Sequence, residues 1–182
     1  MVTMTVMPRE APDWTVDDLD RLPDDGLRYE LLDGTLLVSP APARVHQRAA
    51  FELGHLLRLV CPAGLEVAVA PMDWRPDNRT SLQPDVLVLA NRDLDTAAAD
   101  SMILAVEVIS PSSRRKDAVY KRSKYEDEGV ASYWIVDPDE PSVTALELRD
   151  GRYVTVCEAT GDQQITLTRP FPVTVVPADL IR

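Results

Sequence analysis

Apolar residues recur along the chain in short alternating stretches and in longer stretches at helical spacing. Around Asp33-Gly34, the segment YELLDGTLLVS predicts a β-hairpin, because a two-residue turn needs positive φ and an Asp-Gly pair accepts it. Asp150-Gly151, between SVTALELRD and RYVTVCEA, predicts a second hairpin. Residues 14–22 predict a short helix, and Arg44–Val60 predicts a longer one because its apolar residues follow the helical period.

The middle of the chain is read as strands and one further helix. Residues 65–74 and 85–89 are predicted to be strands, separated by the loop RPDNRTSLQP. MILAVEVIS is apolar throughout, which is typical of a strand buried on both faces. SPSSRRKDAVYKRSKYEDEG predicts a helix that ends at Gly129, and ASYWIVDPDEP and FPVTVV predict two more strands. This order indicates an α/β fold with a mixed sheet flanked by helices and peripheral β-hairpins.

Length and composition indicate one ordinary globular domain. The chain has 182 residues, so we expect a flexible leader over residues 1–13 and a single domain over residues 14–182. There is no apolar run of roughly 20 residues and no signal-peptide pattern at the N-terminus. Cys61 and Cys157 have no near partner, which favours reduced thiols and a cytoplasmic protein without membrane contact.

The net charge restricts the substrates that the protein would bind. At −11, the chain should not bind polyanions indiscriminately. A nucleic-acid substrate would therefore need a local basic patch. One dense patch exists, at the start of the helix predicted before Gly129, where backbone N–H groups also favour phosphate. It contains Arg114, Arg115, Lys116, Lys121, Arg122 and Lys124.

Two acidic residues interrupt the apolar strands. Asp85 directly precedes VLVLA, and Glu107 lies in the middle of AVEVIS. A buried carboxylate is costly unless it is paired or binds a cation. Either acid alone would be explained by a local partner or by a strand end. Together, on neighbouring strands, they offer hard oxygen ligands for Mg²⁺ or Mn²⁺.

The helix after Glu107 carries a candidate catalytic cation. Asp117, Lys121 and Tyr125 are spaced by four residues and share one face of the helix. They would form either an ordinary solvated charge pair or part of a site. Because the helix follows Glu107 closely, its first turns should lie near the end of that strand, where ligand sites of α/β sheets gather. There Lys121 would hold an attacking water or stabilise developing negative charge.

These motifs resemble a known family. QPDVLVL followed by AVEVISPSS resembles the PD-(D/E)XK nuclease motif, and the fuller pattern is similar to the Uma family of putative restriction endonucleases. The matching segments are YELLDG, SPAPARVHQ, QPDVLVL, VEVISPSS, DAVYKRSKYEDEGV and YWIVDPD. The resemblance implies a mixed sheet flanked by helices, a divalent metal on Asp85 and Glu107, and attack by water on a DNA phosphodiester.

The resemblance includes one departure from the superfamily motif. It also extends to Glu30, His46 and Tyr125. The superfamily lysine stands two residues after the glutamate, where this chain has Ile109, so Lys121 is implied to reach in from the helix instead. Glu30 would be a third acid facing the metal or an exposed strand acid. His46 would be a base, a substrate contact or a structural histidine. Tyr125 would pack over the site, hydrogen-bond within it or belong to the core.

Three functions are compatible with these features. The first is a magnesium-dependent endonuclease acting on DNA, with Arg114, Arg115 and Lys116 as phosphate contacts. The second is a binding or regulatory protein that keeps the nuclease fold without activity, which the net charge and the displaced lysine favour. The third is a metal-dependent hydrolase of a small phosphoester. A homodimer is expected in the first case, since cutting both DNA strands commonly takes two sites.

Overall fold

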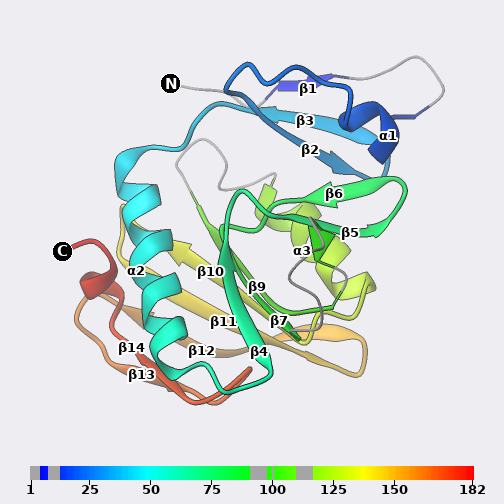
Figure 1. Cartoon of the computed structure of the whole chain (residues 1–182). Coiled ribbons are helices and arrows are strands. Elements are labelled where there is room, and N and C mark those ends of the chain that lie inside the picture. Colours follow the sequence, from blue (N-terminus) through cyan, green and yellow to red (C-terminus); the bar gives the residue numbers. More distant parts are fainter. Residues whose placement is uncertain (1–4, 8–12, 91–97, 100, 110–116) are drawn as a thin grey trace.

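Two six-stranded sheets form most of the structure. The computed structural model describes residues 5–7, 13–90, 98–99, 101–109 and 117–182, and each sheet is composed of strands within those ranges (Figure 1). The central sheet has the order β12-β11-β10-β9-β7-β4, in which β9 and β10 are parallel and all other neighbours are antiparallel. Its strands are β4 (Leu65–Val69), β7 (Val86–Ala90), β9 (Met102–Val108), β10 (Ser132–Asp137), β11 (Ser142–Arg149) and β12 (Arg152–Thr160).

The N-terminal sheet lies above one end of the central sheet, as Figure 1 is drawn. Its strand order is β1-β3-β2-β6-β5-β8. Part of the segment expected to be a loose leader contributes a strand, because β1 pairs with β3. The elements of this layer are β1 (Thr5–Met7), α1 (Val16–Leu19), β2 (Arg28–Leu32), β3 (Thr35–Ser39), β5 (Asp73–Asp77), β6 (Thr80–Leu82) and β8 (Ala98–Ala99).

Both faces of the central sheet are covered at β7 and β9, which explains why these two strands are almost continuously apolar. On one face, Leu53 and Leu57 of α2 (Arg44–Val60) belong to the same core cluster as Val86 and Val106. On the other face, Tyr125 of α3 (Asp117–Asp127) packs with the alternate residues of the strands. A small hairpin and a 3-10 helix complete the first core: β13 (Ile165–Leu167), β14 (Val173–Val175) and η1 (Pro177–Leu180).

The turns and helices follow the predictions closely. Asp33 and Gly34 have φ of 48° and 84°, and Asp150 and Gly151 have φ of 51° and 76°, as two-residue hairpin turns require. The helix predicted over Arg44–Val60 has these bounds in the structure. None of the helices described is both long and apolar enough to span a membrane.

One strand prediction and one loop prediction were wrong, and one strand was not predicted. Residues 65–74 are not one strand, because β4 ends before Pro71, which has no N–H to donate, and the chain then enters β5 of the other sheet. The predicted loop RPDNRTSLQP contains the end of β5 and all of β6. The third error is β13, whose short sequence ITL carries little periodicity of its own and which forms by pairing with β14.

Candidate active site

Asp85 and Glu107 lie side by side on adjacent antiparallel strands. Val86 of β7 is opposite Val106 of β9, so Asp85, one residue earlier, is opposite Glu107 and shares its face of the sheet. The Asp85 backbone N–H donates to the carbonyl of Val106 (2.9 Å), and the Val108 N–H donates to Asp85 Oδ2 (2.8 Å). Both carboxylates are buried. The two acids predicted from the sequence are therefore neighbours.

Helix α3 brings Lys121 and Tyr125 to these acids. Lys121 Nζ lies 2.8 and 3.0 Å from the two carboxylate oxygens of Glu30 and 3.4 Å from Glu107 Oε2. The hydroxyl of Tyr125, one helical turn later, donates to Glu107 Oε1 (2.8 Å). Lys121 and Tyr125 are buried as well. Tyr125 thus packs in the core and also hydrogen-bonds within the site, and Glu107 is held by two side chains of one helix.

Strand β2 supplies Glu30 and an arginine that was not predicted from the sequence. Arg28 Nη1 donates to Asp85 Oδ1 (3.2 Å), and its Nη2 donates to Glu30 Oε1 (3.4 Å) and to the carbonyl of Gln83. The Gln83 N–H also donates to Glu30 Oε1 (2.8 Å). The alternation of a strand places Arg28 and Glu30, two residues apart, on one face. The sequence signal that could have identified Arg28 was this spacing of opposite charges shortly before an Asp-Gly turn.

His46, in the first turn of α2, completes the cluster. Its Nε2 lies 3.2 Å from Asp85 Oδ2. Its other ring nitrogen, Nδ1, is buried and has no hydrogen-bond partner among the described residues. His46 therefore joins the acids in the structure, although its role as a base or a substrate contact stays a prediction.

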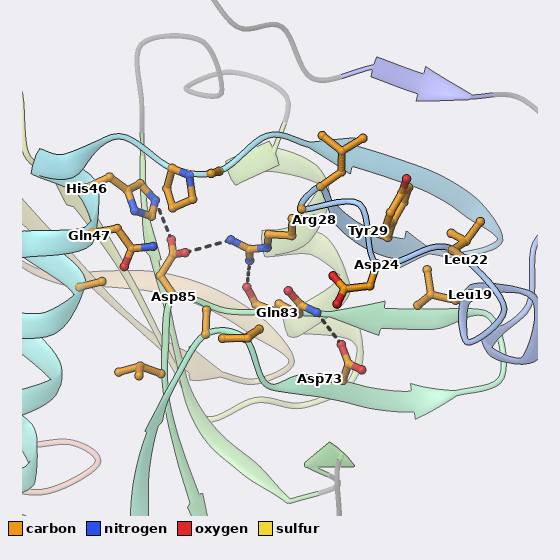
Figure 2. A pocket seen from close by; sticks show the side chains of 18 of the residues that line it. Leu19, Leu22, Asp24, Arg28, Tyr29, His46, Gln47, Asp73, Gln83 and Asp85 are labelled. Atoms are coloured by element: carbon orange, nitrogen blue, oxygen red, sulfur yellow. Dashed lines mark hydrogen bonds and ion pairs between the residues drawn. The ribbon is translucent and has the colours of Figure 1, made fainter.

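A cavity of about 590 Å³ gives access to one side of this cluster. Figure 2 shows Asp85 between His46 and Arg28 among the residues that line it, with the two ion pairs drawn as dashed lines. Glu30, Glu107, Lys121 and Tyr125 do not line the cavity. The cluster thus has an accessible side, which centres on Asp85, and a buried side, which centres on Lys121.

The cluster contains more carboxylates than cations, and this imbalance affects the pKa of Glu107. Three carboxylates, those of Glu30, Asp85 and Glu107, surround the two cations Arg28 and Lys121. Burial, and then the negative charges of Asp85 and Glu30, raise the pKa of Glu107 to about 7 against the opposing effect of Lys121. Glu107 therefore tends to retain a proton at pH values at which an exposed glutamate is fully ionised.

The other members of the cluster keep their charges. Burial would raise the pKa of Asp85, but the hydrogen bond with His46 and the charge of Arg28 outweigh it and lower that pKa to about 2. For Glu30, the charges of Arg28 and Lys121 likewise outweigh burial and lower the pKa. Burial disfavours the charged form of Lys121, yet Glu107 and Glu30 raise its pKa above the usual value.

We expect Glu107→Gln to stabilise the metal-free protein in alkaline solution. The pKa of Glu107 rises on folding from 4.5 to about 7, so the folded state binds the proton more tightly than the unfolded state does. Ionising Glu107 therefore costs stability as the pH rises through this window, by about 3 kcal/mol above pH 7. Glutamine removes that cost. Urea denaturation in EDTA should show the stabilisation at pH 8 and little effect at pH 4.

The exposed strand residue Glu158 provides the control for this measurement. Glu158→Gln should leave stability nearly unchanged at both pH values, because its side chain lies in solvent. Equal stability of the wild-type protein and Glu107→Gln at pH 8 would contradict the charge imbalance described above.

The donor set is suited to a hard divalent cation. Asp85 and Glu107 offer carboxylate oxygens, and a cation beside Glu107 would replace the proton that the charge imbalance retains there. Within the described residues, no three His, Cys, Asp or Glu side chains are grouped so as to hold a metal by themselves. Mg²⁺ does not require such a cage, because it is commonly held by one or two carboxylates and keeps several waters. The residues present therefore fit Mg²⁺ or Mn²⁺.

Part of the predicted substrate surface lies outside the described residues. Arg114, Arg115 and Lys116 immediately precede α3 and belong to residues 110–116, which the structure does not describe. Of the same basic cluster, Arg122 and Lys124 are described, and both are engaged with protein groups. Arg122 donates to the carbonyl of Tyr153 (3.2 Å), and Lys124 Nζ lies 2.9 Å from Asp33 Oδ1.

Comparisons with known proteins agree with this architecture. The model of the family Uma2, described as "Putative restriction endonuclease", matches residues 16–179. Among solved structures, the chain is similar to the crystal structure of "a putative nuclease belonging to DUF820" from Anabaena variabilis ATCC 29413, with 17% sequence identity and a TM-score of 0.69. The match covers 92% of this chain and 97% of that chain, and confirms the predicted α/β nuclease fold. No curated protein matches the chain.

Proposed function

The chain belongs to the Uma2 family of putative restriction endonucleases, and we propose that it is an endonuclease that hydrolyses DNA phosphodiester bonds with the help of a divalent metal ion. Family membership supports a nuclease function. The observation that carries the metal-dependent chemistry is the pairing of Asp85 with Glu107 on adjacent strands, beside Lys121. A carboxylate at the wall of a cavity, a neighbouring carboxylate that retains a proton near neutral pH, and a buried ammonium are groups that such a hydrolysis can use.

We assign Asp85 and Glu107 as the residues that hold Mg²⁺ or Mn²⁺. When bound, such an ion polarises a phosphoryl oxygen and makes a coordinated water more acidic. Asp85 is kept ionised by Arg28 and His46, and it is oriented by the Val108 N–H. Glu107 is oriented by the Tyr125 hydroxyl. The protein thus holds both ligands in fixed positions before the cation arrives, which lowers the cost of binding it.

The remaining residues position the reacting groups. Lys121 contacts Glu107 and Glu30, and in this proposal its positive charge would stabilise the negative charge that develops on the phosphate. In this arrangement Glu30 is the anion that retains Lys121 beside Glu107. His46 lies at the end of the cavity and would contact the substrate, as a base or a hydrogen-bond donor.

DNA contacts and assembly are further parts of the proposal. Arg114, Arg115 and Lys116 would bind phosphates on either side of the cleaved bond. Their positive charges would offset the negative net charge of the protein only in their own neighbourhood. A homodimer would place two such sites on the two strands of one duplex.

Nicking of a supercoiled plasmid by the purified wild-type protein tests this function. We expect conversion to the open circle with Mg²⁺ or Mn²⁺ and none with EDTA. Mn²⁺ binding without cleavage of any nucleic acid would favour a nuclease-fold binding protein, which the replacement of the superfamily lysine by Ile109 also favours. Hydrolysis of a small diester such as bis(p-nitrophenyl) phosphate without plasmid nicking would favour a small-phosphoester hydrolase.

A further inference from the structure

The cavity that reaches Asp85 has apolar walls on its outer side. Leu27, Phe51 and Val69 line it, although 45%, 65% and 47% of their surfaces are exposed. The ring of Phe51 stacks on His55, one turn further along α2, at a centroid distance of 6.4 Å and an interplanar angle of 6°. An exposed aromatic ring beside other apolar side chains is a platform on which a planar group can stack.

Polar groups in the cavity are available for a ligand. Gln47 and Asp24 both line the cavity, and Figure 2 draws them on opposite sides of Arg28. Among the described residues, no hydrogen bond or ion pair engages either side chain. An amide donates and accepts at once, and a carboxylate accepts from amino groups. These are the side chains that recognise the edges of nucleobases.

The described residues that line the cavity offer little positive charge for a continuous phosphate backbone. Their cationic side chains are Arg28, next to Asp85, and Arg75, which lies 2.8 Å from Asp20 and 2.7 Å from Asp73. Duplex DNA carries one negative charge for about every 1.7 Å of its length. Arg28 can serve one phosphodiester beside Asp85, whereas the acidic and apolar remainder disfavours a run of phosphates.

We propose that this cavity binds the base of one unpaired nucleotide whose phosphodiester lies at Arg28 and Asp85. The volume of about 590 Å³ falls in the range of roughly 300–1,000 Å³ that small-ligand pockets have. It suits one nucleotide and excludes a base pair that remains in its stack. This inference rests on the proposed nuclease function and specifies its substrate: an unpaired nucleotide, as in a single strand or a bulge.

Binding of a fluorescent strand tests the proposal independently of cleavage. Fluorescence anisotropy in EDTA would compare a single-stranded oligonucleotide with the same strand in a duplex, and 2-aminopurine in the strand would report stacking. We expect the wild-type protein to bind the single strand about tenfold more tightly than the duplex, or better. Phe51→Ala should weaken strand binding by roughly tenfold and abolish the quenching of 2-aminopurine, because one base–aromatic stack is lost.

Leu59→Ala is the matched control. Leu59 is on the same helix and 69% exposed, but it does not line the cavity, so strand binding should be unchanged. Equal binding of duplex and strand, no strand binding, or equal effects of Phe51→Ala and Leu59→Ala would overturn the proposal. Phe51-dependent strand binding without metal-dependent cleavage would support the base site and count against the nuclease function. Metal-dependent cleavage that Phe51→Ala leaves unchanged would support the nuclease function and count against the base site.

Discussion

Replacing Asp85 by asparagine is expected to abolish Mn²⁺ binding and to lower metal-dependent cleavage by on the order of a hundredfold or more. Asparagine keeps the shape of the side chain and an oxygen for the Val108 N–H, but it removes the anion. Of the two proposed ligands, Asp85 is the one that stays ionised near neutral pH, because its pKa is about 2 while that of Glu107 is about 7. Asp85→Asn therefore removes the carboxylate that is always charged near neutral pH.

The variant should stay folded, which keeps this result interpretable. The pKa of Asp85 falls on folding from 3.8 to about 2, so its ionised form stabilises the folded state above pH 4, and that stability is lost as the pH falls toward 2. Asp85→Asn should therefore cost about 2 kcal/mol at pH 7. Calorimetric titration with Mn²⁺ and plasmid nicking are the measurements, with Asp127→Asn, at the exposed end of α3, as the control. Wild-type Mn²⁺ affinity in Asp85→Asn would exclude Asp85 as a ligand.

Replacing Lys121 by methionine is expected to have the largest effect on stability. Methionine keeps most of the volume of the side chain but leaves the carboxylate of Glu30 without its 2.8 Å partner in a buried site. Removing one partner of a buried ion pair typically costs about 3–5 kcal/mol. The loss should be largest at pH 8 and smaller at pH 5, where Glu107 holds its proton in the folded protein. Urea denaturation at the two pH values measures it.

Lys124 on the same helix is the comparison cation: its own side chain is 10% exposed, but its acidic partners are far more exposed than those of Lys121. Its Nζ lies 2.9 Å from each of Asp33, Asp77 and Glu128, but these acids are 66%, 40% and 32% exposed in their side chains. Solvent screens such pairs, so Lys124→Met should cost only about 1 kcal/mol. Equal losses in Lys121→Met and Lys124→Met would show that Lys121 is not the central cation of a buried cluster.

Local sequence patterns were sufficient for the elements whose formation is local. The helical period predicted α2 with its observed bounds, and the two Asp-Gly pairs predicted both hairpins. The break of the predicted strand at Pro71 could not be predicted locally. The residues that follow Pro71 pair with strands of a second sheet, and the local sequence does not reveal that sheet. The strand β13 was missed for the same reason, since its pairing with β14 is tertiary information.

The candidate site shows a similar division. A carboxylate in an apolar strand is conspicuous in a sequence, so Asp85 and Glu107 were found, and the regular spacing of α3 led to Lys121. Arg28 was missed because an arginine beside a turn reads as surface. Its burial follows from the packing of β2 against the start of β7, across 57 residues of sequence. How far each member of the cluster lies from the cavity could not be read from the sequence either.

The cluster is assembled from both sheets, and this origin has a consequence for the newly made chain. Arg28 and Glu30 come from the N-terminal sheet, Asp85 and Glu107 from the central sheet, and Lys121 from a helix 91 residues after Glu30. Contacts between segments so far apart form late, after the cost of closing the intervening loop has been met. An N-terminal fragment emerging from the ribosome would hold Glu30 and Asp85 without Lys121. The proposed hydrolytic activity would thus remain latent until most of the protein had been synthesised and its two sheets had docked.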